Sequence, residues 1–294
     1  MDYLGLQIKL SPDATLVTKR NSRALPRKCV ALLPLLALPL ISMAQESSRP
    51  TPTPAIALSD KAVIRLARDA YYSLVNRGLA KFQVTVAPDW KKYVAEVTAA
   101  QSGPTPDAQK VAQMEEIQFL AAVNEEGEIR VKPFRSGGGD IDPSLAQVTD
   151  GMKQMIQGFY TTWLPLVFSN PFPDPDVSYT LKRESEKYHV LTKDGETSSD
   201  IVLDKNYLAT EMAVDMPKMK VKIVPSYEKT DKGLLLTGID SDINSGQIKV
   251  YVSIDYKEVQ GFKLPSHVSY KVPFANKPGQ TITVEAWFLH YQLN

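Results

Sequence analysis

The chain has 294 residues, of which 43% are hydrophobic and 23% are charged, and its formal net charge is +1. This composition excludes wholesale disorder and a protein with many membrane spans, and the length allows one large domain or two small ones with a real hydrophobic core. The near-neutral charge gives no global electrostatic support for nucleic-acid binding.

The first 44 residues have the layout of an export signal. A basic stretch precedes an apolar run over residues 29–41, and Ser42-Met43-Ala44 follows as a small-residue cleavage site. The run is shorter than the roughly 20 residues that span a bilayer, and two prolines interrupt it. We therefore expect residues 1–44 to be a cleaved signal peptide and the mature chain to be soluble in the periplasm or another extracytoplasmic space. An uncleaved signal that anchors the chain is the alternative.

Cleavage after Ala44 would also remove Cys29, the one cysteine of the chain. Cys29 stands at the start of the apolar run, whereas an acylated cysteine would follow the run, so no lipid anchor is expected. The processed chain would have no disulfide and no thiolate nucleophile.

Residues 45–58 are rich in Ser, Thr and Pro and predict a spacer between the signal and the fold. The first half of the remaining chain mixes helices with a few strands. Apolar residues at helical spacing predict helices near residues 60–77, 89–97, 107–114 and 144–168. The last of these has the widest apolar stripe.

After residue 177, the sequence predicts almost nothing but strands and turns. Every second residue in 218–223 is lysine, and the apolar residues of 248–256 likewise share one face, as in an antiparallel sheet with one side on a core and one in water. We therefore predict an α+β fold. A large curved antiparallel sheet, an unclosed β-barrel, would hold helices in its concave face as a single domain over residues 59–294.

Two segments at the carboxyl end carry a family resemblance. A Y-x-E-V-x-G-x-x-L-P pattern is formed by Tyr256, Glu258, Val259, Gly261, Leu264 and Pro265, and a final strand over residues 282–294 ends in Asn. This ending resembles that of LolA-like proteins, a group of periplasmic lipoprotein carriers and their relatives. The resemblance implies an unclosed β-barrel with a helical lid and an apolar cavity for acyl chains. Residues 87–175 depart from it, being longer and more helical than a plain carrier needs.

Apolar residues on one predicted helix and two predicted strands are candidates for the lining of such a cavity. Methionine and aromatic side chains adapt to varied apolar shapes. The candidates on the helix are Met152, Met155, Phe159 and Trp163, and those on strands are Val250, Val252, Ile254 and Trp287. All eight could equally be sealed core. Because a glycine run precedes the helix over residues 144–168 and a proline cluster follows it, we expect the helix to cover the cavity as a lid.

No pattern of catalytic or metal-binding residues is found. His189, His267 and His290 each lie alone in a predicted strand, with no HExxH motif and no close His/Asp pair. Residues 240–246 resemble the opening of a calcium loop, but the glutamate that would complete it is missing, so a loop rich in Asp and Asn is favoured. We expect no metal, no cofactor and no enzymatic activity.

The sequence thus predicts an exported, non-enzymatic protein that binds an apolar ligand, such as a lipid, an acyl chain or a lipoprotein. A membrane surface is a further candidate partner, and nucleic acid is not. The alternative is a structural or protein-interaction module of the cell envelope, whose concave face is filled by its own helices. No sequence feature separates these two hypotheses or indicates an oligomeric state.

Export predicts that the mature chain begins at Gln45 and is recovered in the soluble extracytoplasmic fraction. Amino-terminal sequencing of the fractionated protein checks this. A chain that begins at residue 1, or that stays in membranes after a carbonate wash, would contradict the export hypothesis.

Overall fold

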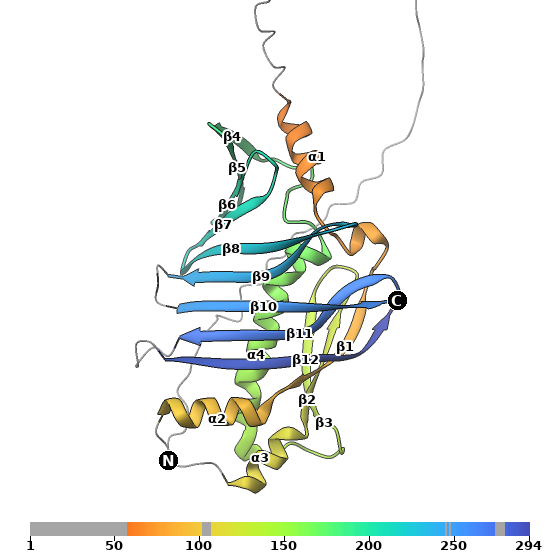
Figure 1. Cartoon of the computed structure of the whole chain (residues 1–294), viewed down its shortest axis with the longest axis vertical. Coiled ribbons are helices and arrows are strands. Elements are labelled where there is room, and N and C mark those ends of the chain that lie inside the picture. The colour runs from red at the N-terminus through yellow and green to blue at the C-terminus, as the bar shows by residue number, and fades with distance from the viewer. Residues whose placement is uncertain (1–57, 102–106, 245, 247, 274–279) are drawn as a thin grey trace, which may run out of the picture. The chain divides into compact units, whose positions relative to one another are not determined.

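The computed structural model describes residues 58–101, 107–244, 246, 248–273 and 280–294 (Figure 1). The predicted signal peptide, and the predicted spacer up to residue 57, lie outside this part of the chain. The described residues from Ser59 to Asn294 belong to one compact unit, and all twelve of their strands form a single antiparallel sheet.

The strand order places the start and the end of the fold side by side. It runs β3-β2-β1-β12-β11-β10-β9-β8-β7-β6-β5-β4, so the first three strands add to the last one, and β3 and β4 form the two edges. Because the sheet is not closed into a barrel, the predicted α+β fold with an open antiparallel sheet is confirmed. The strands are β1 (Phe82–Pro88), β2 (Ile117–Val123), β3 (Ile129–Arg135), β4 (Thr180–Glu184), β5 (Lys187–Asp194), β6 (Thr197–Leu203), β7 (Ala209–Met216), β8 (Met219–Thr230), β9 (Gly233–Ile243), β10 (Ile248–Val259), β11 (Phe262–Pro273) and β12 (Thr281–Leu293).

Four helices and three short helical turns accompany the sheet in the described residues. They are α1 (Asp60–Ala70), α2 (Trp90–Gln101), α3 (Ala108–Glu115) and α4 (Ala146–Trp163), with shorter turns η1 (Val75–Arg77), η2 (Pro143–Leu145) and η3 (Leu164–Phe168). The buried side chains of Val84, Phe119, Val268 and Phe288 lie on one face of the sheet, which we call the inner face. The opposite face is the outer face.

Helix α4 crosses the inner face, roughly at right angles to the long strands (Figure 1). The indole Nε1 of Trp163 donates a hydrogen bond of 2.9 Å to the hydroxyl of Tyr256 on β10. The ring of Phe159 contacts Tyr270 of β11 and Phe288 of β12, with centroid distances of 6.3 and 5.6 Å. One helix therefore ties together three neighbouring strands.

The predicted helix over residues 144–168 is divided in the structure. Its α-helical part ends at Trp163, and the chain continues as the π-helical turn η3. Pro165 explains the change, because it has no N–H to donate and its ring clashes with the carbonyl one turn earlier.

The first predicted helix also ends early, at Ala70. Tyr71 is extended and bridges Leu234 of β9, and the N–H of Tyr72 donates to the Leu234 carbonyl at 2.9 Å. Gly233 permits this close approach. It has a φ of +113°, and a Cβ there would lie 3.0 Å from backbone atoms of this segment. Pairing with the sheet thus overrides the helical spacing of the sequence.

Helix α2 takes the place of a strand along the first part of β12 (Figure 1). Strand β1 pairs with β12 only as far as Pro88, opposite Ala286. Beyond that point, the N–H of Asp89 donates to the carbonyl of Glu285 at 2.9 Å, and Lys92 forms an ion pair of 2.8 Å with the Glu285 carboxylate. The helix thereby covers a stretch of strand edge that β1 leaves open.

The cover of the inner face differs along the strands. At the end where β8 and β10 finish, the hydroxyls of Tyr71 and Tyr72 accept hydrogen bonds from the N–H groups of Ala209 and Lys263 at 2.6 and 2.8 Å. Helix α4 crosses the middle. A strand of twelve residues is about 40 Å long and a helix about 10 Å wide, so one crossing helix covers only part of this length.

The carboxyl group of Glu285 makes stability depend on pH. Burial alone would raise its pKa, but hydrogen bonds from Lys92 and Ser269 and the charge of Lys92 outweigh burial and hold the pKa below the usual 4.5. Because the pKa is lower in the folded than in the unfolded chain, ionised Glu285 stabilises the fold above about pH 4.5, and this contribution is lost as the pH falls through the folded-state pKa.

We expect Glu285→Gln to flatten the fall in melting temperature between about pH 5 and pH 3. Glu125→Gln is the control, because the ion pair that Glu125 forms with Lys81 is exposed to solvent. An acid dependence of the Glu285 variant equal to that of the wild type would contradict this role.

Candidate functional site

The eight residues predicted to line a ligand cavity do not form one surface in the structure. One group is buried, with at most 4% of each residue exposed: Met152, Phe159, Trp163 and Ile254. A second group is half-buried: Met155, Val250 and Val252. Trp287 is 47% exposed and lies on the outer face, since its neighbours along β12 are buried on the inner face.

The buried group belongs to a packed aromatic cluster beneath α4. The ring of Trp163 lies 6.0 Å from those of Phe159 and Tyr160 and 6.4 Å from that of Phe82. Burial raises the pKa of the Tyr160 hydroxyl well above its usual value. The middle of the inner face is therefore core, and α4 seals it.

Trp287 is held in place on the outer face by a histidine. Its ring stacks on that of His267 with a centroid distance of 4.1 Å. Nδ1 of His267 lies 3.1 Å from Asp255 on β10, and Nε2 lies 2.7 Å from Glu285 on β12. These partners belong to neighbouring strands, so the strand register brings them together.

The prediction that each histidine stands alone is therefore wrong for two of the three. Besides His267, His189 lies 3.1 Å from Asp200 on the adjacent strand. Sequence spacing could not reveal these ion pairs, because all three form across strands. No group of three or more His, Cys, Asp or Glu side chains in the described residues could hold a metal ion.

The inner face carries aliphatic side chains that α4 does not seal, at the end of the sheet where β8 and β10 begin. Four of them form a row in register across β7, β8, β9 and β10, and two more lie beside that row on the same face. All six are half-buried. We call them the apolar strip: Val214, Val221, Ile223, Ile243, Ile248 and Val250.

The strip extends beyond the core rather than forming part of it. Ile223 pairs with the buried Met212, which places the strip on the inner face. Ile223 and Val250 pack against the buried core, and the row formed by the other four members lies further toward the strand ends. Of the eight residues predicted for the site, only Val250 belongs to the strip.

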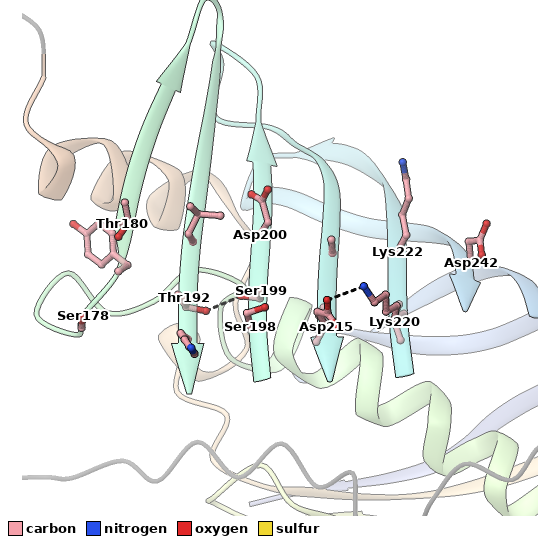
Figure 2. Close-up of a pocket in the computed structure, with 16 residues that line it drawn as sticks. Ser178, Thr180, Thr192, Ser198, Ser199, Asp200, Asp215, Lys220, Lys222 and Asp242 are labelled. Atoms are coloured by element: carbon pink, nitrogen blue, oxygen red, sulfur yellow. Dashed lines mark hydrogen bonds and ion pairs between the residues drawn. The ribbon is translucent and has the colours of Figure 1, made fainter. Parts of the chain in front are cut away.

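A pocket of about 610 Å³ follows strands β4 to β9 at this same end of the sheet (Figure 2). Val214 and Val221 also line it, but its charged side chains alternate with them along β7 and β8 and lie on the outer face, opposite the apolar strip. The hydroxyls of Thr192 and Ser199, which also line it, lie 2.6 Å apart on paired positions of β5 and β6. None of the eight predicted residues lines this pocket.

The polar part of the pocket contains charges of both signs. Its lining includes three lysines, Lys193, Lys220 and Lys222, and three aspartates, Asp200, Asp215 and Asp242. These residues are spread over β5 to β9, so only the folded sheet brings them together. The arrangement can bind a polar group without favouring one sign of charge overall.

Comparisons with known proteins assign no family. No protein-family model, curated protein or solved structure matches this chain. The resemblance of the carboxyl end to LolA-like proteins stays a prediction. In the described part of the chain, no helix is both long enough and apolar enough to cross a membrane.

Two tryptophans test the distinction between sealed core and open surface. Trp163→Ala removes a fully buried ring and should lower the free energy of unfolding by about 3 to 5 kcal/mol. Trp287→Ala, the same change at an exposed ring, should cost no more than about 1 kcal/mol. Denaturant unfolding measures both. Comparable losses in the two variants would contradict the assignment of α4 to the core.

Proposed function

We propose that this protein is an exported, non-enzymatic carrier or sensor that binds an apolar chain on the apolar strip of its inner face. The proposal keeps the predicted class of ligand, a lipid or acyl chain, and moves the site from beneath α4 to the strand ends. The observation that carries it is the strip itself, a row of aliphatic side chains in register across four strands and only half-buried.

Burial of these side chains supplies the driving force for binding. Each methylene group of a ligand that leaves water gains about 0.8 kcal/mol. Contiguous apolar surface that a protein leaves exposed commonly marks a binding site. The binding of an apolar chain needs only shape and burial, which agrees with a sequence that has no catalytic pattern.

A second candidate function is a structural or protein-interaction module of the envelope. The buried ring cluster around Trp163 and Phe159 favours it, because α4 fills the middle of the inner face as such a module requires. The two candidates differ at the strip, where a ligand carrier binds an alkyl chain and a filled module does not.

A fluorescent fatty-acid probe separates the candidates through two matched variants of β8. Val221→Asn places an amide in the apolar strip and should weaken probe binding about tenfold, since it removes the burial of roughly two methyl groups. Val224→Asn makes the same change on the outer face of the same strand, where Val224 is 41% exposed, and should leave binding unchanged.

Melting temperatures of both variants show whether each is folded. A wild-type protein that does not bind the probe would refute the carrier proposal and leave the filled module. Equal loss of binding in the two variants would show that the probe does not use the strip.

A further inference from the structure

The outer face of the sheet carries exposed apolar side chains near the β3 edge. Trp287 on β12 is 47% exposed, and Leu120 on β2 is 39% exposed. Phe134 on β3 and Leu289 on β12 are half-buried, and neither packs against the buried core of the described residues. We call these four residues the outer patch. Apolar surface that is contiguous and exposed commonly marks an interaction site.

Strand register brings the outer patch together on one surface. Leu120 pairs with Thr85 of β1, and Thr85 pairs with Leu289. Trp287 stands two residues before Leu289 on β12, so both side chains point to the same face. Phe134 lies on this face of β3. The patch therefore crosses four adjacent strands, from β3 to β12.

Trp287, the largest member of the outer patch, is held in place by its neighbours. Its ring stacks on that of His267 at 4.1 Å, and His267 in turn lies between the carboxylates of Asp255 and Glu285. A side chain that is already fixed loses less conformational entropy when a partner binds. A tryptophan among smaller apolar residues is typical of the energetic centre of a protein interface.

Large and small side chains alternate between the two central strands of the outer patch. Strand β12 presents Trp287 and Leu289, and the paired positions of β1 are Ala87 and Thr85. A two-fold axis parallel to the strands, between β1 and β12, would place β12 of one copy over β1 of a second copy. The large side chains of each copy would then fill the space above the small side chains of the other, as in two sheets packed face to face.

Charges on the two sides of the outer patch are complementary about the same axis. Lys132 is exposed on β3, where it pairs with Leu120. Asp255 on β10 has a side chain that is 75% exposed. Since β3 and β10 are each the third strand from the axis, the axis places Lys132 of one copy over β10 of the other. The two charged residues then lie about 7 Å apart along the strands, a distance that a lysine side chain can span.

The edge beside the outer patch disfavours another mode of association. Strand β3 contains Pro133, which has no N–H to donate, and the exposed cations Arg130 and Lys132. Proline and charge on an edge strand oppose the addition of a further strand. A second copy is therefore expected to bind on the face of the sheet and not at its edge.

We propose that the outer patch is a homodimer interface, in which two copies pack face to face about a two-fold axis between β1 and β12. The apolar strip lies on the inner face, so this inference does not depend on the proposed function, and the dimer leaves the strip accessible. The six strands from β3 to β10 are only about 24 Å across, so the contact is small and the dissociation constant is expected in the micromolar range.

Sedimentation velocity of the purified mature protein tests the proposal between concentrations of about 1 and 500 µM. The wild type should pass from monomer to dimer, and Trp287→Ala should raise the dissociation constant at least about tenfold. Tyr251→Ala is the matched control, because Tyr251 is a 40% exposed aromatic residue on the outer face of β10 but outside the patch. Since Trp90 and Trp163 are buried, a blue shift of tryptophan emission on dimerisation reports on Trp287.

Two charge reversals test the arrangement of the dimer. Lys132→Glu and Asp255→Lys each place like charges opposite one another, so each variant alone should dimerise about tenfold more weakly. In an equimolar mixture, a heterodimer of the two variants regains both ion pairs and should form with nearly the wild-type affinity. Asp255→Lys also removes the contact with His267, but a purely local defect would persist in the mixture. Melting temperatures show whether each variant is folded.

Each other outcome overturns the proposal. A wild-type protein that stays monomeric throughout the concentration range refutes it, as does a dimer that survives Trp287→Ala, because its interface lies elsewhere. If the monomer instead shows a blue shift of Trp287 emission with phosphatidylglycerol vesicles, the patch binds a lipid surface and not a second copy. A mixture of the charge variants that does not associate contradicts the two-fold arrangement.

Discussion

The fold requires that the apolar inner face of the sheet be covered, and the sheet is wider than its longest helix is long. Twelve strands at about 4.8 Å spacing make a sheet some 50 to 60 Å wide, and α4, with 18 residues, is about 27 Å long. Different segments of the chain cover different parts of the sheet. Tyr71 and Tyr72 close one end of the strands, α4 seals the middle, and α2 covers the edge of β12. The apolar strip is a half-buried part of this face beyond the core, and the proposed function is based on it.

Much of this fold could be predicted from the sequence, because local patterns determine it. Strict alternation over 248–256 and 218–223 identified long strands with one apolar face, and the stripe on residues 144–168 identified the helix that crosses them. The errors fall where a distant segment or a single proline overrides the local pattern. Tyr71 leaves its helix to pair with Leu234, and Pro165 turns the end of α4 into a π-helix.

The candidate site was harder to predict, since burial and register decide it and neither can be read from spacing. Trp163 and Phe159 have the residue types of an adaptable groove, yet α4 presses them into the sheet as core. Val221 stands in a predicted strand, but Ile243 stands in a segment predicted as a loop, and that prediction is wrong because β9 continues to Ile243. Only the pairing of Val221 with Ile243 across β8 and β9 makes them part of one surface. The pairs that fix His267 were likewise hidden, because their members are far apart in the sequence.

Isoleucine methyl NMR can distinguish a ligand chain on the strip from one beneath α4. The δ1 methyls of Ile223, Ile243 and Ile248 report on the strip, and those of Ile156 and Ile254 report on the sealed core. On addition of monomeric dodecyl maltoside, we expect shifts of the three strip resonances with little change in the two core resonances. Larger shifts at Ile156 and Ile254 would mean that the chain enters under α4, and would refute binding on the strip.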